Sequence, residues 1–313
     1  MNTHEKGFLT ILIVLCMIGA LSPLSAAGQK AVNATIEPVV SIIDSRNKTI
    51  SLPYVPQRIV SLSPNITETL FALGLGEKVV GRTDYCDYPP EAASIAAMGD
   101  LLSPSIEKIL SMEPDLVIIG DIGQAQTVDA IETGGVPIAY INEPGTMDGT
   151  YRIIEQVGKI TGTDVQAKQL VSKMKKTIAE ATAHLPATNR PTVYHVTGFG
   201  EWGDFTATGD TYLHDVITLA GGINIASDAV NWSYQVELLL ANDPDILILP
   251  ALWGTTPEET KQNFVSHPPY SSLTAVKNDK IITSVENNIM DRQGPRSAEA
   301  VAQLAHAFMQ LSR

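Results

Sequence analysis

The sequence predicts an α/β protein with two Rossmann-like lobes, each with a mostly parallel sheet, joined by one long α-helix. Short apolar runs typical of buried strands alternate with helical stretches, both before and after a long amphipathic segment. The chain has 313 residues, 44 % of them hydrophobic, and a mean hydropathy of +0.08. This is enough apolar material for two ordinary cores, which excludes a disordered or fibrous protein.

The first lobe is expected to open with a hairpin, in which extended runs at residues 39–43 and 49–52 flank a polar turn. Apolar β-rich runs then alternate with helical patterns. Strands are expected at residues 58–62, 116–119 and 138–141, and helices at residues 66–73, 106–112 and 128–133. This order is typical of a parallel sheet covered by helices.

Residues 164–185 form a single amphipathic pattern, which predicts a helix about 33 Å long at 1.5 Å per residue. Such a helix between two lobes is a stiff connection. Its predicted buried face consists of Val165, Leu170, Val171, Met174, Ile178, Ala181 and Leu185. The second lobe is expected to have strands at residues 192–196, 246–249 and 281–285, and helices at residues 213–220, 236–241 and 298–311.

The N-terminus has the order of an export signal: Lys6, an apolar run over residues 8–21, Pro23 and small residues at 25–27. An uncleaved anchor extended through Leu24 is the alternative, and both place the rest of the chain outside the cytoplasm, in the periplasm or at the cell surface. Cys16 is not expected to carry a lipid. The predicted organisation is a signal peptide at residues 1–27, an N-terminal lobe with its hairpin at 28–162, the inter-lobe helix at 163–188 and a C-terminal lobe at 189–313.

The charge and the cysteine content exclude several functions. With 34 acidic and 21 basic residues the formal charge is −13, which disfavours nucleic acid as a partner. Two cysteines, Cys16 and Cys86, provide neither a disulfide framework nor a thiolate metal cluster. The histidines after the signal show no metal-ligand spacing and are interpreted as ordinary surface or helix residues, so no metal site is assigned.

An internal repeat is the most specific feature of the sequence. The pattern S-x-x-x-E-x6-P-D followed by four apolar residues occurs at residues 103–119 and again at residues 233–249. In each copy we expect the serine to cap a helix and the glutamate, Glu107 or Glu237, to lie in the first turn, where the helix dipole favours an anion. One such glutamate alone is an ordinary helix-dipole carboxylate. A matched pair on two rigidly joined lobes predicts a two-point grip for a partner that carries arginines.

These motifs resemble a known family. The matching segments are residues 58–64, 67–68, 84–90 and 106–118, with Gly74 and Gly81 between them. They are similar to the helical-backbone (class III) periplasmic substrate-binding proteins of ABC importers, closest to the cobalamin-binding branch. The resemblance covers nearly the whole chain after the signal. It implies a permease dimer as partner, which Glu107 and Glu237 would contact, and a small-molecule ligand held between the lobes.

The ligand site is expected between the lobes, because ligands of open α/β sheets bind beyond the carboxyl ends of the strands. The loops at this edge contain all three tryptophans, Trp202, Trp232 and Trp253, and also Phe205. Flat side chains of this kind suit a large planar or macrocyclic ligand. Sealing of the sheet edges is the structural alternative for each tryptophan.

The resemblance assigns further ligand-binding residues. Tyr85 matches a tyrosine that lines the corrin face, Trp232 lies within one residue of a pocket tryptophan, and Arg292 with Asn288 match a basic and an acidic pocket position. Leu101, Gly120 and Asn288 depart from the pattern, because the cobalamin branch has tryptophans at or near the first two positions and an aspartate at the third.

The ligand implied is a corrinoid such as cobalamin, with no resident cofactor. A ferric siderophore is the first alternative and would need basic groups, for which Arg82, Arg292 and Arg296 are the candidates. Haem is the second and would need an axial ligand, available from Tyr85, Tyr88, Cys86 or His195. A sensor that reports the ligand through the same two glutamates is a third alternative.

An enzyme is the rival class. Glu68, Asp84, Asp87 and Asp121 could meet near the cleft and perform acid–base chemistry. The sequence, however, lacks the common nucleophile, zinc, P-loop and dinucleotide motifs. The chain is therefore not expected to be an enzyme.

Overall fold

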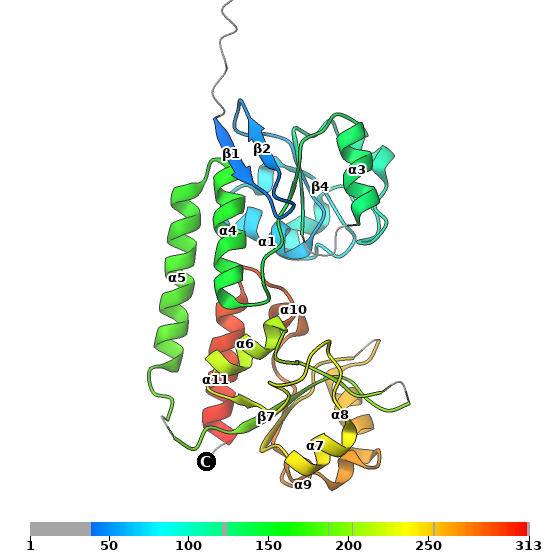
Figure 1. Cartoon of the computed structure of the whole chain (residues 1–313), viewed down its shortest axis with the longest axis vertical. Coiled ribbons are helices and arrows are strands. Elements are labelled where there is room, and N and C mark those ends of the chain that lie inside the picture. Colours follow the sequence, from blue (N-terminus) through cyan, green and yellow to red (C-terminus); the bar gives the residue numbers. More distant parts are fainter. Residues whose placement is uncertain (1–38, 121–123, 187, 202, 253, 312–313) are drawn as a thin grey trace, which may run out of the picture. The chain divides into compact units, whose positions relative to one another are not determined.

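The computed structural model describes residues 39–120, 124–186, 188–201, 203–252 and 254–311. Residues Glu37–Arg313 group into one compact unit. A two-stranded hairpin sheet and two larger sheets lie in this unit, and long helices connect the two larger ones (Figure 1). Within the described ranges, no helix is both long and apolar enough to cross a membrane.

The N-terminal lobe has the architecture that the sequence predicts. The hairpin is antiparallel, and the sheet behind it is parallel throughout, in the order β4-β3-β5-β6. Its strands are β1 (Val40–Ile43), β2 (Thr49–Leu52), β3 (Ile59–Ser61), β4 (Val79–Arg82), β5 (Leu116–Ile119) and β6 (Ile138–Tyr140). Its helices are α1 (Pro64–Ala72), α2 (Ile106–Ser111) and α3 (Ala125–Thr133), with 3-10 turns at Gly76–Lys78 and Pro90–Ser94. β4 has no counterpart among the predicted strands, because Gly81 interrupts its apolar run.

The C-terminal lobe has a five-stranded sheet in the order β11-β10-β7-β8, with β9 also pairing with β7. Only β8 runs antiparallel to its neighbour among the described strands of this sheet. The strands are β7 (Thr192–Gly198), β8 (Phe205–Thr206), β9 (Ile223–Asn224), β10 (Ile246–Ile248) and β11 (Ile281–Ile282). The helices are α6 (Tyr212–Leu219), α7 (Val236–Asn242), α8 (Pro257–Ser266), α9 (Thr274–Lys277), α10 (Asn287–Met290) and α11 (Ser297–Leu311), with a 3-10 turn at Tyr270–Ser272.

The connection between the lobes is thicker than one helix. α5 (Asp164–Thr182) packs along both α11 and α4 (Met147–Thr161). α4 is not among the helices predicted from the sequence, although it has clear boundaries. Thr146 accepts a hydrogen bond from the Gly149 amide at 3.0 Å, and Gly162 ends the helix with φ +71°.

The predicted buried face of α5 is wrong at Val165, and Leu185 lies beyond the last helical residue, Thr182, although it packs against the core. Val165 is 65 % exposed, whereas Ala167, Val171 and Met174 are buried. Val165 lies in the first turn of the helix, before the buried stripe begins.

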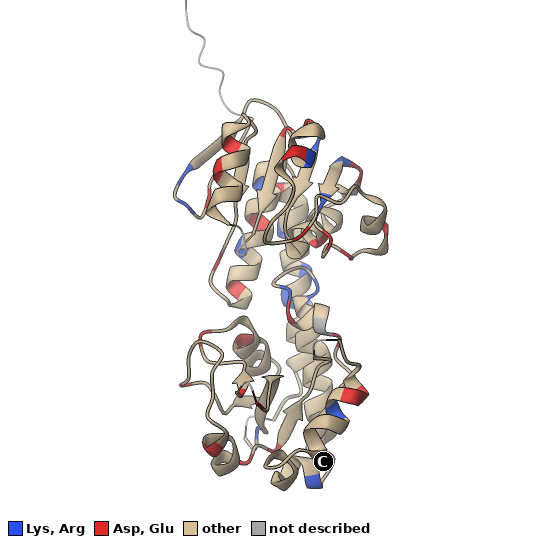
Figure 2. Cartoon of the chain, turned by 90° about the vertical axis from the view of Figure 1, so that its right-hand side faces the viewer, with Lys and Arg blue, Asp and Glu red and all other residues tan. Residues whose placement is uncertain are grey.

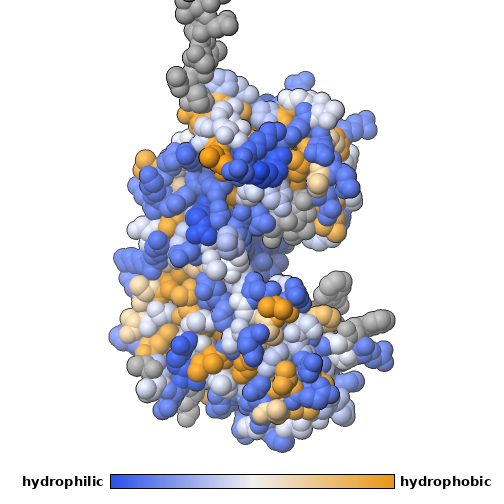
Figure 3. Space-filling model, in the orientation of Figure 1, coloured by the Kyte–Doolittle hydropathy of each residue, from blue (hydrophilic) through white to orange (hydrophobic). Residues whose placement is uncertain are grey.

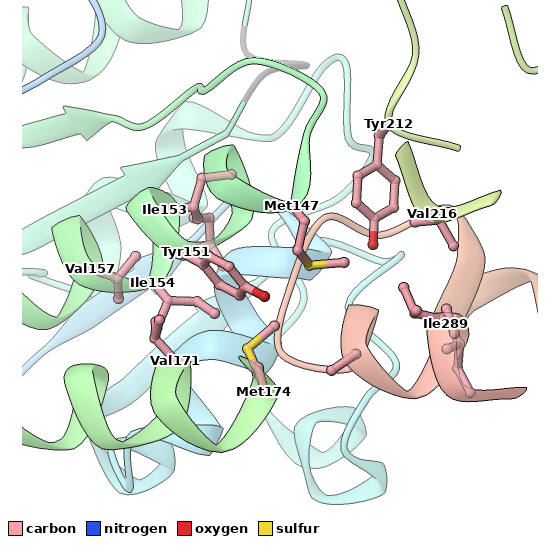
Figure 4. Close-up of a cluster of buried hydrophobic side chains, with 14 of the residues drawn as sticks. Met147, Tyr151, Ile153, Ile154, Val157, Val171, Met174, Tyr212, Val216 and Ile289 are labelled. Atoms are coloured by element: carbon pink, nitrogen blue, oxygen red, sulfur yellow. The ribbon is translucent and has the colours of Figure 1, made fainter. Parts of the chain in front are cut away.

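One hydrophobic cluster extends through both lobes. Figure 4 shows its centre, where α4 contributes Met147 and Tyr151, α5 contributes Met174, and α6 contributes Tyr212 and Val216. The same cluster includes core residues of both sheets. The two lobes therefore share a continuous core, which resists hinge motion more strongly than a single connecting helix would.

Candidate functional site

A cleft of about 1090 Å³ lies between the lobes, at the carboxyl ends of the strands. Figure 3 shows the molecular surface hollowed at this place. The N-terminal lobe lines the cleft with Pro64, Asn65, Tyr85, Asn142, Glu143 and Gly145. The C-terminal lobe lines it with His195, Thr197, Asp210, Thr211, Tyr212, Leu213, Trp232, Pro250, Ala251, Leu252, Gly254, Thr255, Asn288, Asp291, Arg292 and Gln293.

The cleft brings together four of the predicted ligand-binding residues, namely Tyr85, Trp232, Asn288 and Arg292. Tyr85 is 52 % exposed and Trp232 is 44 % exposed, so both rings are accessible. Phe205 is not among the lining residues. It starts the antiparallel strand β8, and its ring lies against the backbone of Gly198, where a side chain on that glycine would begin 3.0 Å from the ring. Trp202 and Trp253 lie outside the described residues, so their roles in ligand binding stay predictions.

The backbone around Trp232 is held in an unusual conformation. Asn231 and Trp232 both have left-handed φ angles, +60° and +62°, which non-glycine residues seldom adopt. The Asn231 amide donates to Asp210 at 3.1 Å, and the Trp232 amide donates to the Thr208 hydroxyl at 3.0 Å. These bonds offset the backbone strain and fix the indole at the cleft.

Two arginines join the lobes through a buried carboxylate. Arg296 binds Glu68 with two hydrogen bonds, of 2.9 and 2.8 Å, and Arg292 reaches the same carboxylate at 3.0 Å and Asp87 at 2.6 Å. The Glu68 side chain is only 2 % exposed. Burial lowers the pKa of both arginines, but their carboxylate partners outweigh burial and raise it. Arg292 and Arg296 are therefore charged groups that hold the lobes together.

The three arginines predicted as basic groups for an anionic ligand are not free in the structure. Arg82, Arg292 and Arg296 are the basic groups that the sequence offers to an anionic ligand, and only Arg292 lines the cleft. Arg82 donates to the backbone carbonyls of Thr83, Ala92 and Ala93. Arg296 is held by Glu68 and stacks on the ring of Tyr88 at 3.7 Å.

Arg292 has an acidic neighbour, Asp87, which belongs to the N-terminal lobe. Asn288 donates to Asp87 at 3.2 Å, and Asp87 lies in the loop after β4. Burial raises the pKa of Asp87, yet the hydrogen bond and the charge of Arg292 outweigh it and hold the pKa below its usual value. Asp87 thus places a carboxylate beside Asn288 and Arg292, although it is not among the described residues that line the cleft.

The remaining polar lining is rich in carboxamides and poor in cations. Asn65, Asn142, Asn288 and Gln293 provide amide groups. Three of these are also bonded within the protein: Asn65 and Gln293 donate to backbone carbonyls, and Asn288 donates to Asp87. The described lining residues include three carboxylates, those of Glu143, Asp210 and Asp291, and one cation, Arg292, and Glu143 is paired with Arg152 at 2.7 Å. Acidic positions are also spread over both lobes (Figure 2). Such a cleft suits a ligand with many neutral hydrogen-bonding groups and repels an anionic one.

Asp291 has a distinct environment. Its side chain is open to the solvent of the cleft but crowded by protein, and this desolvation raises its pKa to about 6 although Arg292 opposes the shift. The negative charge of the lining therefore decreases below about pH 6.

His195 contradicts the interpretation of the histidines as ordinary surface or helix residues. It lies on β7, is 1 % exposed and lines the cleft. Burial lowers its pKa to about 4, so the ring is neutral at physiological pH. Residues 142–145 were missed as well, although they follow the predicted strand at 138–141 and the strand-end rule points to them.

Cys86, Glu68 and Asp87, three further candidates for an axial ligand or a catalytic acid, are engaged elsewhere. The Cys86 thiol is buried and shares a hydrogen bond with the Thr83 hydroxyl at 3.2 Å. Glu68 and Asp87 both bind Arg292, so neither is poised as a general acid or base, and Asp121 lies outside the described residues. Across the described ranges, His, Cys, Asp and Glu form no group that could hold a metal ion.

The repeated motif places Glu107 and Glu237 at equivalent positions. Each is exposed and lies in the first turn of its helix, α2 or α7. The predicted serine caps are wrong, because Ser105 caps α2 and Gln235 precedes α7 without a side-chain cap bond. The serines of the repeated motif, Ser103 and Ser233, each lie two residues before the N-cap position of the helix.

The aspartate of each Pro-Asp pair has a structural role. Asp115 accepts hydrogen bonds from the Gln57 and Arg58 amides, and Asp245 accepts them from the Thr192 amide and hydroxyl. Each aspartate thereby ties the end of a repeat helix to the start of the neighbouring strand.

Comparison with known proteins identifies the family. A family model described as periplasmic binding protein matches residues 59–286. The chain belongs to the periplasmic binding protein family. This assignment, the two-lobed fold of the solved relatives and the predicted α/β class agree.

The relatives of this periplasmic binding protein include a transporter component and binding proteins for cobalamin and haem. It is 28 % identical over 305 residues to an uncharacterized ABC transporter substrate-binding lipoprotein of Bacillus subtilis, covering 95 % of this chain and 94 % of the relative. It is 26 % identical to a cobalamin-binding protein of Halobacterium salinarum, covering 97 % of this chain and 85 % of that one. Among solved structures, the haem-binding protein RhuT of Roseiflexus sp. RS-1 superposes with a TM-score of 0.72 at 30 % identity, over 82 % of this chain and 99 % of that one.

The periplasmic binding protein is therefore a substrate-binding component of an ABC transporter. It acts outside the cytoplasm, takes a small-molecule ligand and has a permease as partner. The prediction that it is not an enzyme is confirmed by the nature of these relatives.

Proposed function

We propose that this protein captures a corrinoid, such as cobalamin, in the cleft between its lobes and delivers it to the permease of an ABC importer. The docking contacts are the carboxylates of Glu107 and Glu237, one on each lobe, which bind arginines of the permease.

The composition of the cleft wall is the observation that carries the ligand assignment. Four carboxamide side chains line the cleft, three of them with one hydrogen bond or more to the protein, and its one described cation, Arg292, is already paired with Glu68 and Asp87. A corrinoid is a macrocycle with carboxamide side chains around its rim, so amide partners and a flat indole match it. A ferric siderophore or a haem carries carboxylates or other anionic groups, which this lining repels.

Relatives support the same ligand class. The Halobacterium salinarum relative is a cobalamin-binding protein, and a Photorhabdus laumondii relative with 27 % identity over 257 residues is a vitamin B12-binding protein. The volume of about 1090 Å³ is also of the size that a large cofactor-like ligand requires.

Calorimetric titration of the exported chain with cyanocobalamin tests the ligand, with haem and a ferric siderophore in parallel. We expect saturable 1:1 binding of cyanocobalamin with a Kd below about 1 μM, which is about −8 kcal/mol. Binding of haem or the siderophore in place of cyanocobalamin would contradict the ligand assignment and leave the transport role intact.

Haem is a second candidate because of Tyr85. Its phenol is half exposed at the cleft and lies 3.5 Å from Asp100, a long and weak contact, so it is accessible to an iron atom. The 30 % identical Roseiflexus structure is that of a haem-binding protein. If haem is the ligand, Tyr85→Phe should abolish its charge-transfer absorption, whereas it should leave cyanocobalamin binding within about threefold.

The N-terminal residues 1–27 are proposed as a cleaved export signal. Intact-mass measurement of the exported protein should show a chain that begins near residue 28. A mass that includes residues 1–27 would support the uncleaved anchor.

A further inference from the structure

One wall of the cleft contains a pair of buried polar side chains without partners. His195 and Thr197 are two residues apart on β7, whose pairing with β8 is irregular between Val196 and Gly198. Both residues line the cleft. Both ring nitrogens of His195 and the hydroxyl of Thr197 are buried and have no hydrogen-bond partner among the described residues.

The protein around this pair gives no structural reason for two polar residues. β7 is the central strand of its sheet, and its neighbouring positions are Val193, Tyr194 and Val196, which are buried in hydrophobic clusters, although the Tyr194 hydroxyl also has no partner among the described residues. Buried polar groups in native proteins are nearly always paired, and an unpaired group is costly. A pair that faces a ligand cleft is therefore expected to be satisfied by the ligand.

The chemistry of the two side chains defines what they bind. Because burial lowers the pKa of His195 to about 4, its ring is neutral and has one N–H donor and one acceptor nitrogen. The Thr197 hydroxyl also both donates and accepts. A metal ion is a poor match, since a metal-binding histidine usually has its second nitrogen fixed by another group, and His195 has none among the described residues.

We infer that His195 and Thr197 recognise a primary carboxamide of the ligand, accepting from its NH2 group and donating to its carbonyl oxygen. This inference rests on the proposed function, because corrinoids carry such groups at their rim. His195 and Thr197 are then specificity-determining residues, which distinguish an amidated corrinoid from one that bears carboxylic acids. The acceptor nitrogen has a partner in an amide but faces a repelling oxygen in a carboxylate.

The test compares cyanocobalamin with its monocarboxylic acids, made by mild acid hydrolysis of single propionamide side chains. Titrations at pH 7.5 use the exported full chain and the variants His195→Leu, Thr197→Val and His195→Asn. Wild type is expected to bind cyanocobalamin about tenfold or more tightly than at least one of the separated acids. His195→Leu and Thr197→Val should each weaken cyanocobalamin binding about tenfold and reduce this preference to less than about threefold.

Two variants separate recognition from damage to the fold. His195→Asn keeps one donor and one acceptor at the site and should restore part of the preference. His306→Leu replaces an exposed histidine of α11 by the same residue and should bind both ligands as wild type does. Thermal unfolding should show His195→Leu at least as stable as wild type, because an apolar side chain removes an unpaired buried polar group.

The outcomes are distinguishable. If wild type binds none of the cobalamins, the proposed function fails and the inference fails with it. If wild type binds cyanocobalamin but His195→Leu and Thr197→Val keep the preference for the amide, the acidic lining alone causes the discrimination and the inference is wrong. Equal binding of cyanocobalamin and every separated acid by wild type would also overturn it.

Discussion

The buried carboxylate of Glu68 offers the sharpest test of how the lobes are held together. Glu68 lies on α1 of the N-terminal lobe, and its partners Arg292 and Arg296 lie 224 and 228 residues later in the C-terminal lobe. In Glu68→Gln the shape of the side chain is kept and its charge is lost. Arg292 retains Asp87 at 2.6 Å, whereas the other carboxylate paired with Arg296 is that of Glu286, at 3.9 Å.

Glu68→Gln therefore leaves the guanidinium of Arg296, whose side chain is only 9 % exposed, without a close counter-ion. Removal of one partner from a buried ion pair typically costs about 3–5 kcal/mol. We expect Glu68→Gln to lie near the lower end, about 3 kcal/mol, because the amide oxygen still accepts one hydrogen bond. Urea unfolding monitored by tryptophan fluorescence and by circular dichroism measures this change as a lower midpoint.

A matched control is the exposed pair of Lys261 and Asp279, whose nitrogen and oxygen lie 2.6 Å apart. Asp279→Asn removes the same kind of charge at the surface and should cost less than about 1 kcal/mol. If Glu68→Gln loses no more stability than Asp279→Asn, burial does not make the Glu68 pair important and the reasoning is refuted.

Three further predictions concern the ligand, the permease and pH. Trp232→Ala should weaken cyanocobalamin binding by more than about 1 kcal/mol in calorimetry, because the indole lines the cleft. Glu107→Lys combined with Glu237→Lys should abolish stimulation of the permease ATPase in proteoliposomes and leave ligand affinity unchanged, because both side chains are exposed on the helices of the repeated motif. Desolvation by the surrounding protein raises the pKa of Asp291 from 3.8 to about 6, so the folded chain binds more protons than the unfolded chain in this window, and the contribution of Asp291 to stability falls as pH rises from about 4 to 6. Asp291→Asn should remove that decrease in a series of thermal melts.

Each of these predictions has an outcome that contradicts it. Unchanged affinity in Trp232→Ala would make the indole a structural seal. Normal ATPase stimulation by the double variant would exclude the glutamates as docking contacts. An identical pH dependence of melting in wild type and Asp291→Asn would show that Asp291 does not titrate in this window.

The secondary structure was largely predictable because its signals are local. The strand at Leu116–Ile119 and the helix starting at Ile106 follow from apolar periodicity and from the Pro-Asp pair that separates them. The errors are also local. α4 was missed although Thr146 and Gly162 mark its ends, and the caps of α2 and α7 were misplaced by two residues because several residues near each start can cap a helix.

The site was predictable only as a set of loops. The rule that ligands bind beyond strand ends identified the loops with Tyr85, Trp232 and Arg292. It provided no means of seeing that Arg292 is paired with Glu68, because nothing in the sequence relates positions 224 residues apart. The sequence offered His195 both as a haem ligand and as an ordinary surface or helix residue, since a histidine in an apolar strand gives no sign of whether its face meets the core or a cleft.

The sequence by itself determined the α/β class, the alternation of strands and helices, the repeat that presents Glu107 and Glu237, and the resemblance to substrate-binding proteins. These depend on periodicity, helix boundaries and motif spacing, which act within a few residues of each other. Only the tertiary structure decided that the lobes share one core, that the arginines near the C-terminus bind a buried glutamate of the first helix, and that the cleft wall offers amides and an unpaired His195 among its described residues. The reason is physical: such contacts arise when two sheets pack against common helices, and the packing joins residues that no local pattern connects.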